Sequence, residues 1–161
     1  MRSARSFTMR TLLVFLAVIL GVGVRATVLD PPSLRCAGVQ PGGGASLGWT
    51  IPPDPTGEFL QYDIYTSLSP GGPFTLAASV PNHAATGTLL PGIGTDLGPV
   101  YFYVTTVSTS GAPNTSVPSD TLATLFVEVT QSTPLGSANV NWNLPHNPPL
   151  PTMDSLAIFL E

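Results

Sequence analysis

The sequence predicts an all-β protein, with one sandwich of seven strands followed by the first strands of a second, incomplete sandwich. Apolar and polar residues alternate between Ser33 and Val129, and runs of Pro and Gly interrupt the alternation. A pattern around Trp49 recurs around Trp142. Alternation with a period of two is typical of strands with one buried face, and turn signals about every 8–12 residues are typical of sandwiches.

Turn residues set the bounds of the predicted strands. In chain order these strands are Ser33–Val39, Ala45–Thr50, Phe59–Ser67, Phe74–Val80, Ala85–Leu90, Val100–Ser108 and Leu122–Val129. The second strand must end at the segment 51–57, because its prolines cannot donate hydrogen bonds to a sheet. A Gly- and Pro-rich connection, 91–99, precedes the sixth strand. The module therefore needs no helix.

The alternation also assigns side chains to faces. The predicted shared faces are Ala45, Leu47 and Trp49; Leu60, Tyr62 and Ile64; and Tyr101, Tyr103, Thr105 and Val107. Aromatic faces suit sugars, but the strand alternation places Trp49, Tyr101 and Tyr103 on inward faces, which favours packing in the core over a sugar-binding platform. The aromatic residues that the alternation places on the outward faces of their strands are Phe59, Tyr65 and Phe102. These three are the better candidates for an exposed face.

An internal repeat predicts the domain organisation. Residues 45–52 and 138–145 share Ala, an aliphatic residue, Trp, an aliphatic residue and Pro in the same spacing, and Trp142 follows Trp49 by 93 positions. That spacing is the length of one small sandwich domain. The segment 137–143 repeats the strand that holds the Trp. The residues that correspond to Tyr62, Ile64 and Tyr65 are Leu156, Ile158 and Phe159. We therefore predict a first domain over 27–128 and the start of a truncated second domain over 129–161.

The segment 1–26 has the features of a signal peptide. Basic residues precede an apolar run, Thr11–Val24, and Val24 and Ala26 are the small residues that a signal peptidase requires. As a helix this run would span about 21 Å, less than the roughly 30 Å of a bilayer core. Cleavage is therefore favoured over an uncleaved anchor, and a lipoprotein anchor is disfavoured because Cys36 lies too far along. We expect a secreted or surface-displayed protein with no membrane insertion after cleavage.

The charge balance excludes two classes of partner. The chain has five basic and nine acidic residues and no lysine, and four of the arginines lie within 1–26. The remaining chain carries a net charge of −8 with Arg35 as its single cation. Phosphate backbones and anionic membranes both require clustered Lys and Arg. We therefore expect neither nucleic acid nor a membrane surface as a partner.

No catalytic, cofactor-binding or metal-binding residue is predicted. The acidic residues considered are Asp54, Glu58, Asp63 and Asp96, which we expect to be solvated carboxylates. The oxygen spacing of a calcium loop is absent, and the two histidines, His83 and His146, lack the spacing of a zinc site. Neither a Ser nucleophile motif nor a phosphate-binding glycine loop occurs. The single Cys36 is expected to be a buried small hydrophobe, with pairing to another chain or to a later Cys as the alternatives.

These motifs resemble the fibronectin type III domain. The matching features are Trp49, Tyr62–Tyr65, Leu90–Gly92, Tyr101–Val107, Gly111 and Val117–Asp120. The resemblance implies a seven-stranded immunoglobulin-like sandwich. Eleven positions separate Leu90 from Tyr101, more than the family's usual few.

A narrower resemblance concerns the local sequences of three segments in and next to the loops. The sequences of 49–55, 62–67 and 71–76 are similar to tandem modules in large exported surface proteins of the type associated with gliding motility in bacteria. This resemblance implies a non-catalytic spacer or adhesion module of a larger surface protein. Its partners would be an unknown protein or glycan and the neighbouring modules of the same chain. The alternatives are an accessory module of a secreted hydrolase that degrades polysaccharide or protein, and a stand-alone sugar-binding protein.

Overall fold

The computed structural model describes residues 28–111, 114–132, 136–144 and 146–147. Its strands are β1 (Ser33–Gln40), β2 (Gly44–Thr50), β3 (Phe59–Ser67), β4 (Thr75–Val80), β5 (Gly87–Leu90), β6 (Tyr101–Ser108), β7 (Thr121–Ala123), β8 (Val127–Ser132), β9 (Ser137–Trp142) and β10 (His146–Asn147). The described residues contain no helix, and hence no helix that could span a membrane. The prediction of an all-β chain is confirmed.

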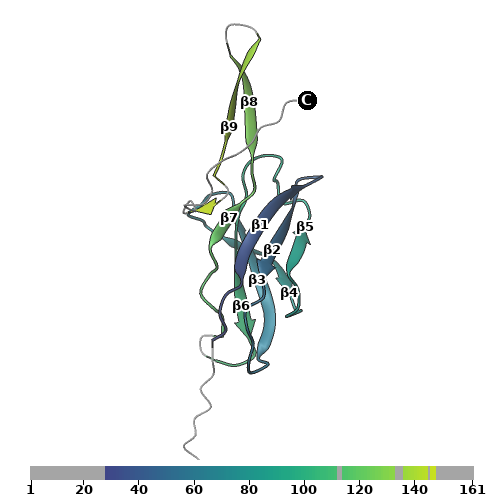
Figure 1. Cartoon of the computed structure of the whole chain (residues 1–161), viewed down its shortest axis with the longest axis vertical. Coiled ribbons are helices and arrows are strands. Elements are labelled where there is room, and N and C mark those ends of the chain that lie inside the picture. Colours follow the sequence, from purple (N-terminus) through teal and green to yellow (C-terminus); the bar gives the residue numbers. More distant parts are fainter. Residues whose placement is uncertain (1–27, 112–113, 133–135, 145, 148–161) are drawn as a thin grey trace, which may run out of the picture.

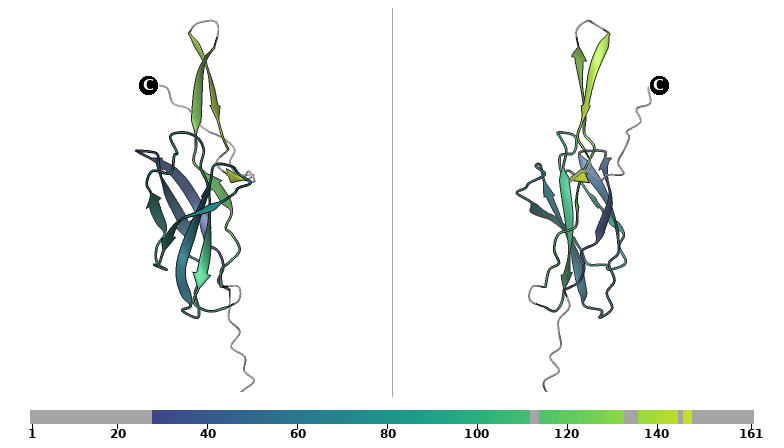
Figure 2. Two further views of the ribbon diagram at one scale, coloured as in Figure 1. Left: turned by 180° about the vertical axis from the view of Figure 1, so that it is seen from behind. Right: turned by 60° about the vertical axis from the view of Figure 1, so that its left-hand side comes forward.

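Two antiparallel sheets face each other across the core (Figure 1). One has the order β1-β2-β5, and the other has the order β10-β7-β6-β3-β4. The strands β1 to β7 form the predicted seven-stranded sandwich, and β10 adds a short strand to its second sheet. A separate two-stranded hairpin, β8–β9, projects beyond one end of the sandwich (Figures 1 and 2).

The core forms where the inward faces of the two sheets meet. Its buried side chains are Leu34, Ala45, Leu47, Trp49, Tyr62, Ile64, Leu90, Val100, Phe102, Val104 and Leu122. Trp49 from the first sheet meets Tyr62 from the second edge-to-face, with ring centroids 5.4 Å apart. This geometry is favoured because the positive edge of one ring meets the negative face of the other. The predicted inward face of β2 is therefore confirmed.

The predicted phase of β6 is wrong. Phe102 and Val104 are fully buried, whereas Tyr101 and Tyr103 are only partly buried on the outer face of the sheet. Both faces of this strand carry large side chains, so alternation alone does not decide between them. A hydroxyl group does, because a tyrosine keeps its polar end in water at a surface while a phenylalanine gains most from full burial.

Two β-bulges explain two further corrections. The register of β3 against β6 shifts between Phe59 and Gln61, which leaves Leu60 46% exposed although Tyr62 is buried. Phe59, expected to point outward, packs against the core instead. The register of β1 shifts between Leu34 and Cys36, and Cys36 is exposed rather than buried. A bulge adds one residue to a strand and so reverses the faces that follow it.

The long connection 91–99 is anchored to the first sheet. Thr95, 2% exposed, donates a hydrogen bond from its hydroxyl to the carbonyl oxygen of Gly44 at 2.8 Å. The backbone N–H groups of Gly94 and Thr95 both donate to the carbonyl oxygen of Gly43. Ile93 packs against the core. This connection is therefore fixed on the turn between β1 and β2.

The predicted last strand, 122–129, is divided between two sheets. β7 completes the sandwich, whereas β8 leaves it and pairs with β9. The side chain of Asn143 ties the base of the hairpin together, because its amide donates to the carbonyl oxygen of Thr124 at 2.9 Å and accepts from the N–H of Phe126 at 2.7 Å. The predicted boundary at 128/129 falls within β8.

The core position of Trp49 yields a stability prediction. Trp49→Ala removes a ring that is 3% exposed and is expected to lower the free energy of unfolding by about 3–5 kcal/mol. Urea unfolding followed by circular dichroism measures the change. The matched control is Leu89→Ala in β5, where the side chain is 69% exposed and the expected change is within about 0.5 kcal/mol. Equal effects of the two substitutions would contradict the assignment of Trp49 to the core.

Candidate functional site

Three aromatic rings gather on the outer face of the five-stranded sheet. Tyr65 of β3 and Tyr103 of β6 are direct cross-strand partners, and their rings stack with centroids 4.8 Å apart and an interplanar angle of 20°. Phe74, just before β4, lies 4.8 Å from Tyr103 at an angle of 53°. Leu76, the partner of Tyr65 on β4, is 55% exposed and extends this surface. We call Tyr65, Phe74, Leu76 and Tyr103 the outer aromatic cluster.

The strand geometry explains why these rings meet. Side chains directly opposite on antiparallel strands lie about 4.5–5.5 Å apart at Cβ, so Tyr65 and Tyr103 are placed to stack. Burial raises the pKa of the Tyr103 hydroxyl, and the nearby Tyr65 raises it further. The Tyr103 hydroxyl therefore remains a neutral hydrogen-bonding group at physiological pH.

A row of polar side chains lies next to the outer aromatic cluster on the same face. Asp63, 9% exposed, accepts hydrogen bonds from Ser79 Oγ at 2.5 Å and from Gln61 Nε2 at 2.8 Å. Thr105 is the cross-strand partner of Asp63, and its buried Oγ1 has no hydrogen-bond partner among the described residues. The expectation that Asp63 is a solvated carboxylate is thus wrong. Rings beside neutral and acidic hydrogen-bonding groups suit an uncharged polar ligand such as a sugar better than an anion.

Asp54 has a structural role in the turn before β3. Its two carboxylate oxygens accept hydrogen bonds from the backbone N–H groups of Glu58 and Phe59, each at 3.0 Å. Desolvation acts to raise the pKa of this carboxyl, but the backbone donors at Phe59, Glu58 and Gly57, and the charge of His83, outweigh it and hold the pKa below its ordinary value of 3.8. Glu58 contributes its backbone N–H to this turn, and its Oε2 is buried without a hydrogen-bond partner among the described residues. Asp54 therefore stabilises the turn.

His83 closes the same end of the sandwich. Its ring packs on Phe59 with centroids 4.9 Å apart, and its Nε2 lies 3.0 Å from the carbonyl oxygen of Pro52. The Tyr62 hydroxyl donates to the carbonyl oxygen of His83 at 3.0 Å. Burial, assisted by the negative charge of Asp54, raises the pKa of Tyr62 to about 12. These contacts give His83 a packing role.

Metal-binding geometry does not occur in the part of the chain that the structure describes, where no three His, Cys, Asp or Glu side chains converge.

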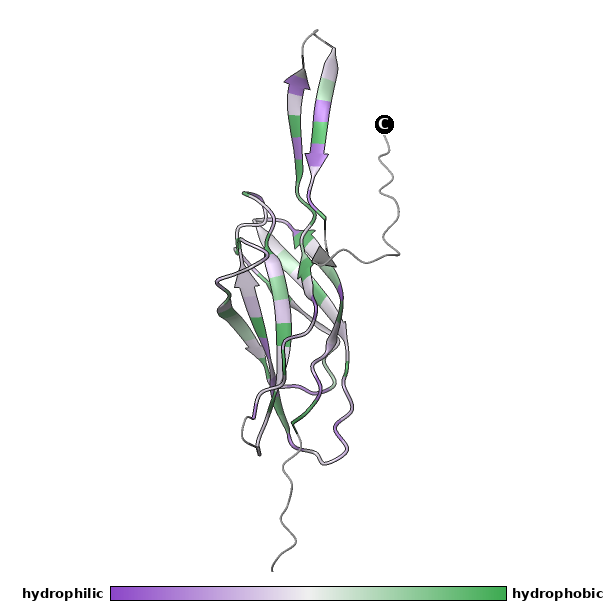
Figure 3. Cartoon of the chain, turned by 90° about the vertical axis from the view of Figure 1, so that its left-hand side faces the viewer, coloured by the Kyte–Doolittle hydropathy of each residue, from purple (hydrophilic) through white to green (hydrophobic). Residues whose placement is uncertain are grey.

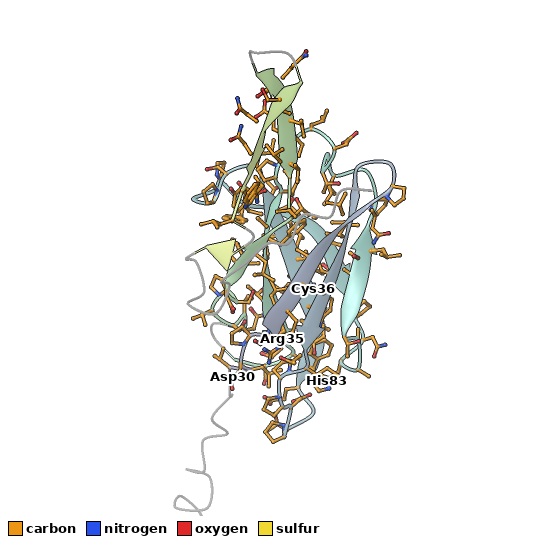
Figure 4. All side chains as sticks on the ribbon, turned by 45° about the horizontal axis from the view of Figure 1, so that its top comes forward. Asp30, Arg35, Cys36 and His83 are labelled. Atoms are coloured by element: carbon orange, nitrogen blue, oxygen red, sulfur yellow. The ribbon has the colours of Figure 1, made fainter. Side chains whose placement is uncertain are left out.

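Figure 4 places Arg35 and Cys36 along β1, with His83 near the end of the sandwich that lies away from the hairpin. Cys36 lies over Gly48 of β2, where an added Cβ would be 2.7 Å from its Sγ. The side chain of His146 lies outside the described residues. The prediction that the chain has no catalytic or cofactor-binding residue remains a prediction.

The two sheets define the class of fold. The order β1-β2-β5 packed against β7-β6-β3-β4 is an immunoglobulin-like sandwich of the fibronectin type III kind.

Comparisons with known proteins give structural neighbours of the same description. A Fn3-like protein from Clostridium thermocellum is 23% identical with a TM-score of 0.48, covering 61% of this chain and 93% of that one. A fibronectin type III domain derived from human KIAA0970 protein is 16% identical with a TM-score of 0.44, covering 60% and 74%. The fn3 domain of human collagen alpha-1(XX) chain is 23% identical with a TM-score of 0.40, covering 63% and 86%. No protein-family model and no curated protein matches the sequence.

The sequence located the outer aromatic cluster only in part. Tyr65 lies on the outer face as predicted, Tyr103 was assigned to the core, and Phe74 was not singled out. The sequence did contain a signal that Tyr103 faces outward. Tyr103 lies on the same strand face as Tyr101 and Thr105, and all three carry hydroxyls. A strand face on which the aromatic residues are tyrosines, opposite a face that carries Phe102, indicates a surface rather than a core.

The pKa of Asp54 yields a prediction on pH dependence. Because folding lowers this pKa, the stabilisation is present above the ordinary value of 3.8 and is lost as the pH falls through the lower value of the folded protein. Asp54→Asn retains one acceptor oxygen in place of two. We expect it to lower the thermal midpoint at neutral pH, with a difference from wild type that shrinks below about pH 4. Thermal scans between neutral and acidic pH measure this, with Glu128→Gln as the control, and a pH-independent difference would contradict the role of the carboxylate charge.

Proposed function

We propose that this protein is a non-catalytic exported module that serves as a spacer or adhesion domain in a larger cell-surface protein. The observation that carries the proposal is the path of the chain. The described chain enters the sandwich at one end, runs up β1, and leaves at the opposite end into the β8–β9 hairpin (Figures 1 and 2). A module with entry and exit at opposite ends adds its full length when it is joined in series.

The composition supports the same proposal. Within the sequence that follows the predicted signal peptide, Arg35 is the single cation, and most of the surface is built from Thr, Ser, Asn, Gly and Pro. Such a surface makes few electrostatic contacts, which suits a spacer between partners that bind elsewhere. The chain also offers the outer aromatic cluster as one face for adhesion.

A second candidate is an accessory module of a secreted hydrolase that degrades polysaccharide. The outer aromatic cluster beside the polar row of Gln61, Asp63 and Ser79 favours it, because aromatic rings contact the apolar faces of sugars while carboxylate and amide groups bind their hydroxyls. In this case the module would hold a carbohydrate against a catalytic domain elsewhere in the protein.

Export is tested by expression of the full chain in a bacterial secretion host. We expect the protein outside the cytoplasm with Thr27 as its first residue, as measured by cell fractionation and mass spectrometry. Leu16→Arg places a charge in the apolar run and is expected to keep the uncleaved chain inside the cell, whereas Ser3→Arg in the basic lead leaves export intact. Retention of the wild-type chain in the cytoplasm would refute the export proposal.

Carbohydrate binding is tested by affinity electrophoresis against a panel of neutral polysaccharides. If the second candidate is correct, a polysaccharide in the gel slows the wild-type protein, and Tyr65→Ser with Tyr103→Ser removes the retardation. Leu89→Ser, on the opposite sheet, serves as the matched control and should migrate like wild type. Unchanged mobility of wild type across the panel would exclude this candidate and leave the spacer function.

A further inference from the structure

The β8–β9 hairpin has one apolar and one polar face. Cross-strand partners share a face, and the pairs Val127 with Trp142 and Val129 with Val140 make one face apolar. The opposite face carries Glu128 with Asn141 and Thr130 with Asn139. Figure 3 shows the resulting alternation of hydrophobic and hydrophilic bands along the hairpin. This pattern is typical of a strand pair with one buried side.

None of the four apolar side chains is buried among the described residues. The exposed fractions are 49% for Val127, 62% for Val129, 37% for Val140 and 44% for Trp142. An isolated two-stranded hairpin is at best marginally stable in water, because it has no second layer to cover its apolar face. The hairpin therefore requires a covering element.

The β1–β2 hairpin shows what such a pair looks like when it is covered. In β1–β2, Leu34 is the partner of Trp49, as Val127 is the partner of Trp142 in β8–β9. Two residues before each Trp lies an aliphatic side chain on the same face, Leu47 in the first hairpin and Val140 in the second. Leu34, Leu47 and Trp49 are each 3–4% exposed. The two hairpins thus share the aliphatic partner of the Trp and the apolar face, although β1 contains a bulge that β8 lacks, and they differ in what covers them.

The cover of the first hairpin comes from the next strand of the same chain. After Trp49 the chain passes through a proline-rich loop and returns as β3, where Tyr62 and Ile64 pack against the Trp49 face. After Trp142 the chain again passes through a proline-rich segment, and then reads Ser-Leu-Ala-Ile-Phe-Leu over 155–160. Leu156, Ile158 and Leu160 fall on one face of an extended strand. Leu156 follows Trp142 at nearly the spacing at which Tyr62 follows Trp49.

We propose that residues 155–160 of this chain form the strand that covers the apolar face of the β8–β9 hairpin. The side chains of Leu156 and Ile158 contact Trp142 as Tyr62 and Ile64 contact Trp49. The seven residues 148–154 span up to about 23 Å when extended, more than the length of either hairpin strand. The inference rests on the proposed function, since it makes the hairpin the first layer of the next module in series.

Contacts at the base of the β8–β9 hairpin fix its position relative to the first sandwich. Asn143 bonds Thr124 and Phe126 just before β8, and β10 pairs His146 with Leu122 and Asn147 with Thr121 on the edge of β7. The chain therefore leaves β10 from a fixed point on the first sandwich rather than from a free linker. This limits the volume that residues 155–160 can reach and raises their effective concentration at the hairpin.

The test uses the solvent accessibility of Trp142 in the chain 27–161. Trp49→Phe makes Trp142 the single tryptophan, because the chain has two. The measurement is acrylamide quenching of its fluorescence. We expect weak quenching in this parent, and a several-fold larger quenching constant after Leu156→Asp with Ile158→Asp. Ala157→Asp, on the opposite face of the same strand, is the matched control and should leave quenching weak.

Three results would overturn the inference. Strong quenching in the parent would mean that residues 155–160 leave the hairpin open. Weak quenching that the paired Asp substitutions do not change would mean that another element covers Trp142. Weak quenching that becomes strong on dilution, with a change from dimer to monomer by sedimentation, would mean that a second copy covers it. Circular dichroism of each variant verifies that the first sandwich is folded.

The outcome is separate from that of the export experiment. Export with an open Trp142 would refute the covering strand and leave the proposed function standing. A shielded Trp142 in a chain that stays in the cytoplasm would support the covering strand and refute the export proposal.

Discussion

The contact of Trp49 with Tyr62 is the constraint on which the sandwich depends. Each ring belongs to a different sheet, so their edge-to-face packing sets how the two layers meet. Tyr62 also uses its hydroxyl to hold the loop at His83, which in turn packs on Phe59. One aromatic pair therefore connects the core to the loops at the end of the molecule. The buried Nε1 of Trp49 has no partner among the described residues, which indicates that ring packing rather than hydrogen bonding holds it in place.

The sequence predicted the fold well and the faces less well. The bounds of β3 were predicted to the residue, and those of β1, β2, β4 and β6 to within one residue at either end. Those signals are local, because prolines and glycines stop strands wherever they occur. The exposure of Leu60 and Cys36 depends on β-bulges, which arise from the fit between two strands and leave no mark in the alternation of one. β6 is apolar or aromatic on both sides, so only the choice of tyrosine against phenylalanine distinguishes its faces.

The same limits apply to the outer aromatic cluster. The phase of Tyr65 predicts a surface position, but the stack needs the register that sets it opposite Tyr103, and the ring of Phe74 joins it from just before β4. The polar row depends likewise on pairing, since Asp63 meets Ser79 only because the register of β3 against β4 sets them opposite each other. A site built across three strands is a property of the sheet, and single-strand periodicity does not contain it.

The orientation of β1 along the molecule has a consequence for tension. β1 begins at the end where the described chain enters, runs along the long axis, and pairs with β2 from Ser33 to Gln40 (Figure 1). A pull on the two ends of the module would load these hydrogen bonds together, in shear, instead of opening them one after another. The anchored loop at Thr95 and Gly44 adds a tie at the far end of the same strand pair. Loading these hydrogen bonds together, rather than one after another, opposes stretching of the module along its long axis.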